Sequence, residues 1–262
     1  MIEPFRRVAI IGLGLIGGSI AKRIREGGCG IEVAALFRDD ADQALAIQEG
    51  TIQRVFPSLC ALIPEVDLVI LATPLRSILD LAAQIAECAK SREEPLLLID
   101  VGSCKRAIAA RFEELSCPLL ELIPTHPIAG SEKSGYSAAE SHLFQGAPWI
   151  VTPHSKNSPS KLAKVEAFLS GLGGCVSYLS AQEHDLQTAL ISHLPGWIAR
   201  HFYNFVTEEA VETLQIAGPG FHSFTRLAHD NPHMRAEIES QNHDLIESWL
   251  ERWLAYLKRE RV

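Results

Sequence analysis

Short apolar runs alternate with segments of helical periodicity along the first two thirds of the chain. The runs are rich in Val, Ile and Leu and have the length of buried strands; they lie at 8–11, 31–37, 67–72, 95–100, 119–123, 144–152 and 173–178. Segments with helical spacing lie between them, at about 20–27, 77–85, 107–112 and 162–172. This alternation predicts an α/β domain with a mostly parallel sheet and right-handed crossovers.

From about residue 183 the pattern changes to long amphipathic helices with few strand signals. One apolar stripe runs from 186 to 205, and a second, with two Trp side chains, runs from 238 to 257. A helical layer of about 80 residues is thin for a domain that stands alone. We therefore predict two domains, 1–181 and 182–262, with the all-helical second domain forming a homodimer. The alternative is that the Trp-bearing helix seals the core.

Composition narrows the class of protein. The chain has 262 residues and 47% apolar side chains, and its net charge of −8 argues against nucleic acid or an anionic membrane as the main partner. No apolar run approaches the roughly 20 residues of a membrane span, and the N-terminus does not resemble a signal sequence. The six cysteines show no C-x-x-C pair and no metal-ligand spacing. We predict a soluble cytoplasmic protein with no metal site, in which the cysteines are reduced and act as small apolar residues.

The first strand ends at a G-x-G-x-x-G sequence that opens the first helix. Gly12 allows the tight turn, Gly14 lets the backbone approach a pyrophosphate, and Gly17 lets helix and strand pack closely. Free N–H groups at the helix start, around Leu15 and Ile16, would then meet the phosphates. We predict a Rossmann-type dinucleotide site, with a glycine-rich turn of another α/β protein as the alternative.

The end of the second strand bears on the choice of cofactor. NAD-binding sheets place an Asp or Glu there for the ribose, but Phe37 and Arg38 occupy these positions, followed by Asp39 and Asp40. An arginine at this point suits a 2′-phosphate. We predict NADP, with NAD as the alternative if an aspartate serves the ribose, or if Arg38 is only a solvated loop charge.

Two further turns are expected to face the cofactor at the carboxyl edge of the sheet. Thr73 and Pro74 close the strand at 67–72, and Ser103 lies in the turn that closes the strand at 95–100. Ser103 also precedes the helical segment at 107–112, so helix N-capping is an alternative role.

The stretch 125–135 follows the strand at 119–123 and is too rich in Gly, Ser and Pro to continue as strand or helix. It predicts a loop at a strand's carboxyl end, where open α/β sheets bind ligands. The loop brings together His126, Glu132, Lys133 and several hydroxyls. A polar surface loop is the alternative.

The helical half carries another set of polar residues. His184, Ser192 and His193 lie at one end or flank of the first long helix, and Pro195 predicts a local kink that exposes His193. A hydrogen-bonded core histidine is the alternative. Arg226 lies among Phe, Thr and Leu, and is either a ligand clamp or a surface cation.

Taken together, four motifs make the chain similar to the prephenate/arogenate dehydrogenases of tyrosine biosynthesis, over essentially its whole length. They are G-L-G-L-I-G-G-S at 12–19, D-V-G-S-C-K at 100–105, H-P-I-A-G-S-E at 126–132, and S-H-L-P at 192–195 with F-T-R-L-A at 224–228. The resemblance implies an oxidative decarboxylation of arogenate or prephenate, with hydride leaving ring C4 for NADP or NAD.

The same resemblance implies roles for individual residues. His126 contacts the C4 hydroxyl and takes its proton, assisted by Ser103, and Arg226 binds the substrate carboxylate. Glu132 is linked to active-site access or to polar contacts around the substrate. The remaining family positions in the substrate site are matched by His184, Ser192 and His193.

The departures from the family pattern concern specificity. Gly196 occupies the position at which many prephenate-preferring members have a histidine. Before the arginine of the F-T-R motif, Ser223 replaces an acidic residue of the family. The Trp that the family has a few residues after this arginine is replaced near Arg235. Together with Arg38, the loss of that histidine resembles the arogenate-preferring, NADP-using branch.

Two other functions are weighed against this one. A β-hydroxyacid dehydrogenase would use a lysine on the first helix of the second domain, but residues 182–205 contain none. A non-catalytic NADP-binding sensor would leave the set of His126, Ser103 and Arg226 unexplained.

Overall fold

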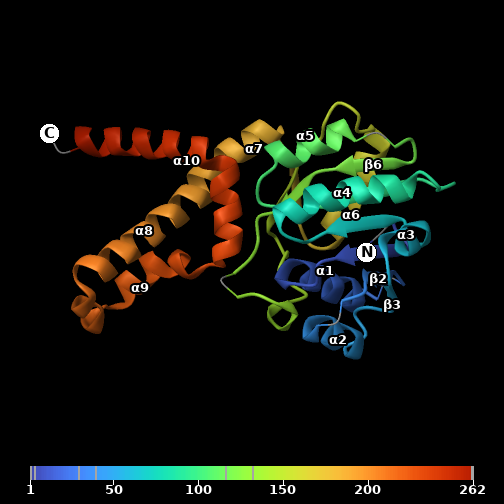
Figure 1. Cartoon of the computed structure of the whole chain (residues 1–262), viewed down its shortest axis with the longest axis horizontal. Helices are drawn as coiled ribbons and strands as arrows, with labels where there is room; N and C mark the ends of the chain where they lie inside the picture. The colour runs from blue at the N-terminus through green and yellow to red at the C-terminus, as the bar shows by residue number, and fades with distance from the viewer. Residues whose placement is uncertain are drawn as a thin grey trace. The chain divides into compact units, whose positions relative to one another are not determined.

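The computed structural model describes residues 2, 4–28, 30–38, 40–115, 117–131 and 133–260. The chain divides into two compact units, Met1–Gln182 and Glu183–Val262. Figure 1 shows the strands in the blue-to-yellow first unit, whereas the orange-to-red part of the chain is drawn as helices.

The first unit contains a six-stranded parallel sheet with the order β3-β2-β1-β4-β5-β6. Its strands are β1 (Arg7–Ile11), β2 (Glu32–Leu36), β3 (Arg54–Phe56), β4 (Leu68–Leu71), β5 (Leu96–Asp100) and β6 (Leu120–Ile123). The predicted Rossmann-type sheet is confirmed, although the short strand β3 was not predicted. The strand order reverses between β1 and β4, which is where such sheets bind dinucleotides.

The helices of the first unit each contribute buried residues to its interior. They are α1 (Leu15–Glu26), α2 (Ala41–Gln48), α3 (Leu59–Leu62), α4 (Leu75–Ala89), α5 (Arg106–Glu114) and α6 (Pro159–Gly171), with 3-10 turns η1 (Ile63–Glu65) and η2 (Tyr136–Ala138). In α4 the buried positions include Ile78, Ala82 and Ile85, spaced as one helix face. Each fully buried Ile or Leu stabilises the fold by about 1.5–3 kcal/mol.

A second sheet corrects the prediction that 125–135 is entirely loop. Its order is β7 (Thr125–Pro127), β8 (Pro148–Val151) and β9 (Cys175–Tyr178), with β7 antiparallel and β9 parallel to β8. Residues 125–127 are strand because β8, distant in sequence, satisfies their backbone groups; local composition cannot indicate this pairing. The strands predicted within 144–152 and 173–178 are confirmed and belong to this second sheet.

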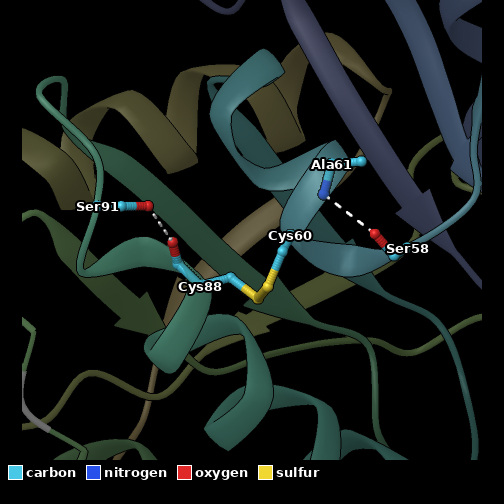
Figure 2. The surroundings of a disulfide bond; sticks show 5 residues. All are labelled: Ser58, Cys60, Ala61, Cys88 and Ser91. Atoms are coloured by element: carbon cyan, nitrogen blue, oxygen red, sulfur yellow. Dashed lines mark hydrogen bonds between the residues drawn. A yellow bond between two sulfur atoms is a disulfide. The ribbon is translucent and has the colours of Figure 1, made fainter.

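The prediction that all six cysteines are reduced is wrong for two of them. Figure 2 shows Cys60 of α3 joined to Cys88 of α4 by a disulfide, with Cα atoms 5.1 Å apart. The two helices pack together, so side chains 28 residues apart in sequence come within reach of each other. Of the free cysteines described, Cys104 and Cys117 are buried and Cys175 is exposed.

The second unit confirms the predicted long helices. Its elements are α7 (Ala181–Thr188), which begins just before the boundary, the π-helical turn η3 (Ala189–His193), α8 (Leu194–Glu209), the 3-10 turn η4 (Val211–Ile216), α9 (Pro219–Thr225), the 3-10 turn η5 (Arg226–His229) and α10 (Pro232–Arg259). Pro195 sits in the first turn of α8, where a missing N–H is tolerated. Helix α10 is kinked at Asn242, whose φ and ψ are −123° and 22°.

The apolar stripe of α10 has two parts. Ile238 and Ile246 are buried within the unit, whereas Trp253, Leu254 and Leu257 are exposed in this single chain. No helix among the described residues combines the length and apolar character needed to cross a bilayer.

Candidate active site

The turn between β1 and α1 has the backbone geometry that a dinucleotide requires. Gly12 has a φ of +103°, and a Cβ added there would lie 2.3 Å from the carbonyl oxygen of Ala72. A Cβ on Gly17 would lie 1.9 Å from the carbonyl oxygen of Gly12. At Gly14, the N-cap of α1, an added Cβ would meet nothing within 4 Å. Packing therefore requires glycine at 12 and 17, whereas the open space at 14 fits the close approach of a pyrophosphate.

The end of β4 lies beside this turn. Leu15 and Ile16 form the first turn of α1, where backbone N–H groups have no intrahelical partner. A Cβ on Gly12 would lie 3.0 Å from the methyl carbon of Thr73, and Pro74 is the N-cap of α4. The Thr73 hydroxyl is buried and has no hydrogen-bond partner among the described residues. Because an unsatisfied buried hydroxyl costs about 1–3 kcal/mol, this site fits a polar ligand atom.

Arg38 lies just beyond β2 with 68% of its side chain exposed. Its Nε is 2.9 Å from an Asp40 carboxylate oxygen. Asp40 also caps α2 by accepting a hydrogen bond from the Gln43 backbone at 2.8 Å. Asp40 is thus committed to the helix and to Arg38, while Asp39 lies outside the described residues.

A buried network holds the end of β5 against the start of β7. The Lys105 ammonium donates to the Asp100 carboxylate and, at 2.7 Å, to the Thr125 carbonyl oxygen. The Thr125 backbone N–H donates back to Asp100 at 3.1 Å, and the Thr125 hydroxyl donates to the Asp100 carbonyl oxygen at 2.6 Å. Trp149 of β8 donates its indole N–H to the Thr125 hydroxyl at 3.1 Å. The network fixes the residue that precedes His126.

The network also sets the electrostatics of this end of the sheet. Complete burial raises the pKa of the Asp100 carboxyl, and the Lys105 ammonium and the N–H groups of Gly102 and Thr125 oppose that rise. A charged pair of this kind is held where water does not reach it, so removing one partner would leave an uncompensated buried charge.

His126 is the central residue of β7 and pairs with Ile150 of β8. Its neighbours Thr125 and Pro127 are buried, whereas His126 is half-buried. Side chains alternate between the two faces of a strand, so His126 points away from the face that Thr125 and Pro127 occupy. The strand therefore presents the imidazole at a partly accessible position with a fixed backbone.

Ser103 lies in the turn after β5, three residues beyond Asp100, and is half-buried. The N-cap of α5 is Lys105, with no side-chain capping bond, so the N-cap role considered for Ser103 is wrong. The helix begins at Arg106, directly after Lys105, whose side chain belongs to the buried network. The sequence-predicted pair of Ser103 and His126 thus flanks one network in the first unit.

The loop after β7 is only partly described. Gly135 has a φ of +83°, in the region that favours glycine, and leads into the turn η2. Ser131 accepts a hydrogen bond from the backbone of Lys133 at 3.2 Å. Glu132 lies outside the described residues, so its predicted role in the substrate site stays a prediction.

The predicted histidines of the helical unit are buried side chains. His184 Nδ1 is 2.8 Å from the Asp185 carboxylate, and both side chains are inaccessible to solvent. His193 is 3% exposed, which corrects the prediction that a kink exposes it. Pro195 is in the first turn of α8, after the π-helical turn, and Asn242 at the kink of α10 lies 3.3 Å from His193 Nδ1.

Burial determines the charge of His193. Desolvation lowers its pKa to about 4; Asp185 opposes this, and the nearby charges of His184 and Arg235 add to it. At neutral pH the imidazole is therefore uncharged and acts as a hydrogen-bonding group.

The other two predicted substrate residues lie at the surface of this unit. Ser192 is exposed on the π-helical turn, next to the buried His193. Arg226 is exposed and begins the turn η5, directly after the buried Thr225. The Thr225 hydroxyl donates to the Phe221 carbonyl oxygen at 2.8 Å, which anchors the start of this turn.

The sequence reasoning missed Asp185 and Asn242 of the helical unit, and it noted Arg235 only as a departure from the family pattern. Asp185, Arg235 and Asn242 are buried polar residues close to the predicted histidines. Only Asp185 had a local signal, as the neighbour of His184. In the described part of the chain no group of three His, Cys, Asp or Glu side chains is arranged to hold a metal ion.

Comparisons with known proteins identify both units of the chain. Residues 20–178 match the family model of the prephenate dehydrogenase nucleotide-binding domain, and residues 180–261 match that of the prephenate dehydrogenase dimerization domain. A prephenate dehydrogenase of Bacillus subtilis is 30% identical over 97% of this chain and 69% of its own length. A cyclohexadienyl dehydrogenase of Zymomonas mobilis is 29% identical over 98% of this chain and 88% of its own length.

Solved structures give the same result. A prephenate dehydrogenase from A. aeolicus, in complex with hydroxyphenyl propionate and NAD+, has a TM-score of 0.90 and 27% identity, covering 99% of this chain and 90% of its own. A Synechocystis arogenate dehydrogenase has a TM-score of 0.80 and 25% identity, covering 97% of this chain and 90% of its own. The chain therefore belongs to the prephenate/arogenate dehydrogenase family of tyrosine biosynthesis, as an NAD(P)-dependent oxidoreductase with a nucleotide-binding domain and a dimerisation domain.

Proposed function

We propose that the protein oxidatively decarboxylates arogenate to tyrosine with NADP as the preferred cofactor. Prephenate, giving 4-hydroxyphenylpyruvate, and NAD are the alternative substrate and cofactor. The observation that carries this proposal is the buried Asp100–Lys105–Thr125 network, which fixes strand β7 and so His126 at the end of a dinucleotide-binding sheet. We assign residues 1–181 to the nucleotide-binding domain and 182–262 to the helical domain that binds substrate and forms the dimer.

His126 is the general base in this proposal. Its imidazole accepts the proton of the C4 hydroxyl, and the Ser103 hydroxyl assists in holding that oxygen. A neutral imidazole has one ring nitrogen with a lone pair, which can accept this proton. Nicotinamide, when bound, would be the acceptor for the hydride from C4. Loss of CO2 makes the ring aromatic and leaves a phenolate at C4, which regains a proton from the protonated imidazole or from water. A base of this kind contributes about 10²–10⁴ in rate.

Arg226 binds a substrate carboxylate with its planar guanidinium. It is exposed on the turn η5, and its two parallel N–H groups match the two oxygens of a carboxylate. His184, His193, Ser192 and Glu132 complete the substrate contacts. The neutral state of His193 suits a hydrogen bond to a polar group of the substrate.

The cofactor is held by the glycine turn and the neighbouring strand ends: Gly12, Gly14, Leu15, Ile16, Gly17, Thr73, Pro74 and Ser103. Arg38 binds the 2′-phosphate of NADP. Two observations support this assignment. The Arg38 guanidinium is exposed, and Asp40 already caps α2 and pairs with Arg38, so its carboxylate is engaged rather than free for a ribose hydroxyl. An NAD site would need a free acid near this position.

The helical unit forms a homodimer in this proposal. Exposed apolar side chains on α8 and α10, among them Phe202, Phe205, Trp253 and Leu257, give it a surface that a second copy would cover. The match to a dimerization domain supports the same assignment.

A four-way assay tests the proposal, with arogenate or prephenate as substrate and NADP or NAD as cofactor. We expect the highest kcat/KM for arogenate with NADP. A clear preference for prephenate would overturn the substrate assignment, and a clear preference for NAD would overturn the role of Arg38. Turnover in none of the four combinations would overturn the reaction itself.

A further inference from the structure

Arg235 in the first turn of α10 is a buried arginine, with 7% of its surface exposed. Arginine is almost never buried this fully unless its charge is paired. Its role is not explained by the reaction proposed above, in which it touches neither substrate nor cofactor.

The partners of Arg235 all lie in one turn of the chain. Its Nη2 donates to the Leu227 carbonyl oxygen at 3.2 Å and to the Asp230 carboxylate. Leu227 directly follows Arg226, and Asp230 directly follows the end of η5. One guanidinium therefore holds both ends of the turn that begins with Arg226.

Gly196 forms the other side of the guanidinium's site. A Cβ added to Gly196 in α8 would lie 1.7 Å from Arg235 Nη1 and 2.3 Å from its Cζ. Since real Cβ atoms are never this close to a neighbour, any residue other than glycine would displace the guanidinium. The requirement for glycine does not come from the backbone conformation, because Gly196 lies in a regular helix. The glycine is needed for space.

One polar atom of the buried Arg235 guanidinium is left without a partner in the described part of the chain. The Arg235 Nε is buried and has no hydrogen-bond partner among the described residues. An unsatisfied buried N–H costs about 1–3 kcal/mol, so the guanidinium is held in this orientation by the turn and by α8 at some cost to stability. In this orientation Nη2 keeps its bonds to Leu227 and Asp230.

We infer that Arg235 and Gly196 are a coupled pair that positions Arg226 for the substrate carboxylate. The inference rests on the role of Arg226 proposed above. Arg235 is a positioning residue: it acts through the 226–230 turn, and Gly196 matters because it makes room for the guanidinium. The absence of a side chain at 196 is thus tied to the arginine at 235.

A double-mutant cycle in the full-length protein tests this inference. Gly196→Ala and Arg235→Ala should each raise KM for the carboxylate substrate about tenfold, the typical effect of misplacing one charge-assisted hydrogen bond. Neither should alter the Kd for NADPH. The double variant should be no worse than Arg235→Ala alone, because the clash disappears with the guanidinium. Multiplicative effects in the double variant would overturn the coupling.

Arg200→Ala is the matched control. Arg200 also joins α8 to α10, through a 2.8 Å bond from its Nη2 to Glu239, but among the described residues its side chain makes no hydrogen bond or ion pair with the 226–230 turn. It should leave KM unchanged even if it lowers the melting temperature. If Arg235→Ala behaves like Arg200→Ala and changes stability alone, Arg235 has no positioning role. If Arg235→Ala fails to fold, Arg235→Lys is used instead. This variant keeps the positive charge but lacks the planar guanidinium, so it should still raise KM.

The inference and the proposed function fail in different ways. Wild type and Arg226→Gln are measured alongside the cycle. If wild type turns over neither arogenate nor prephenate, the proposed function fails. If wild type is active and Arg226→Gln raises KM while Arg235→Ala and Gly196→Ala do not, only the inference fails.

Discussion

The Lys105 ammonium and the Asp100 carboxylate form an ion pair in which both side chains are completely shielded from solvent. The same ammonium binds the Thr125 carbonyl oxygen, and the same carboxylate binds the Thr125 backbone N–H. One buried pair thus joins the end of the parallel sheet to the strand that carries His126. In the D-x-G-S-x-K motif, the first and last residues therefore have a structural role of their own, in addition to the role proposed for the serine.

Removing one partner of this pair should destabilise the protein strongly. We expect Lys105→Met to lower the free energy of unfolding by about 3–5 kcal/mol, because it leaves the Asp100 carboxylate buried and uncompensated. Lys90→Met is the control: Lys90 pairs with Glu87 on the surface, and such pairs contribute about 0–1 kcal/mol. Urea titration measures both. A loss for Lys105→Met as small as that of Lys90→Met would show that the buried pair does not hold the two sheets together.

The buried His193 predicts a pH dependence of stability. Its folded-state pKa is about 4, below the 6.5 of the unfolded chain, so the unfolded state binds more protons between these two values. The stability that comes from keeping His193 neutral is fully present above pH 6.5. As pH falls toward 4 the free energy of unfolding decreases, on the order of 3 kcal/mol in total. His193→Gln should remove this part of the pH dependence. Equal slopes for wild type and variant between pH 6.5 and 4 would contradict the assignment.

Replacing the proposed base should affect chemistry but not cofactor binding. His126→Asn should reduce kcat by at least about 10², because the variant cannot accept the hydroxyl proton. The Kd for NADPH, measured by fluorescence, should change little. His142→Asn provides the control, since His142 is an exposed surface histidine of the same unit. Unchanged kcat in His126→Asn would remove His126 from its role.

Arg226→Gln should act chiefly on KM. Losing a charge-assisted hydrogen bond costs about 1.5–3 kcal/mol, which corresponds to a rise in KM of roughly 10- to 100-fold. Arg111→Gln, in an exposed pair with Glu114 on α5, should leave KM as it is. Steady-state kinetics with saturating cofactor distinguish the outcomes. A fall in kcat with an unchanged KM would mean that Arg226 does not bind the ground-state carboxylate.

Arg38→Ala should weaken the binding of NADPH but not that of NADH. Its guanidinium is proposed to contact only the 2′-phosphate, so the Kd for NADPH should rise about tenfold or more, while the Kd for NADH stays near the wild-type value. Fluorescence titration with each reduced cofactor measures this directly. Arg76→Ala, an exposed arginine of α4, is a control for the general loss of positive charge. Equal weakening of both cofactors would refute a phosphate-specific contact.

The parts of the fold that follow local rules were predictable from the sequence. The apolar runs became β1, β2, β4, β5 and β6, and the glycines at 12 and 17 occupy positions where the backbone leaves no room for a Cβ. Their physical causes, burial and close packing, act on a few consecutive residues. The sequence pattern records them directly.

Features that depend on distant partners were not predictable in this way. Residues 125–127 form a strand only because β8 pairs with them, and Cys60 meets Cys88 only because α3 packs on α4. Lys105 replaces Ser103 at the start of α5 for the same kind of reason. The contact of Gly196 with Arg235 joins residues of two helices. Such contacts leave no local periodicity or composition in the sequence.

The most direct test of the central claim is the stoichiometry of a single reaction. Wild-type protein is incubated with arogenate and NADP, and NADPH, CO2 and tyrosine are each quantified, with His126→Asn run in parallel. We predict equal amounts of the three products from wild type and a strongly reduced yield of all three from the variant. CO2 without NADPH, or no tyrosine from either protein, would contradict oxidative decarboxylation by this enzyme.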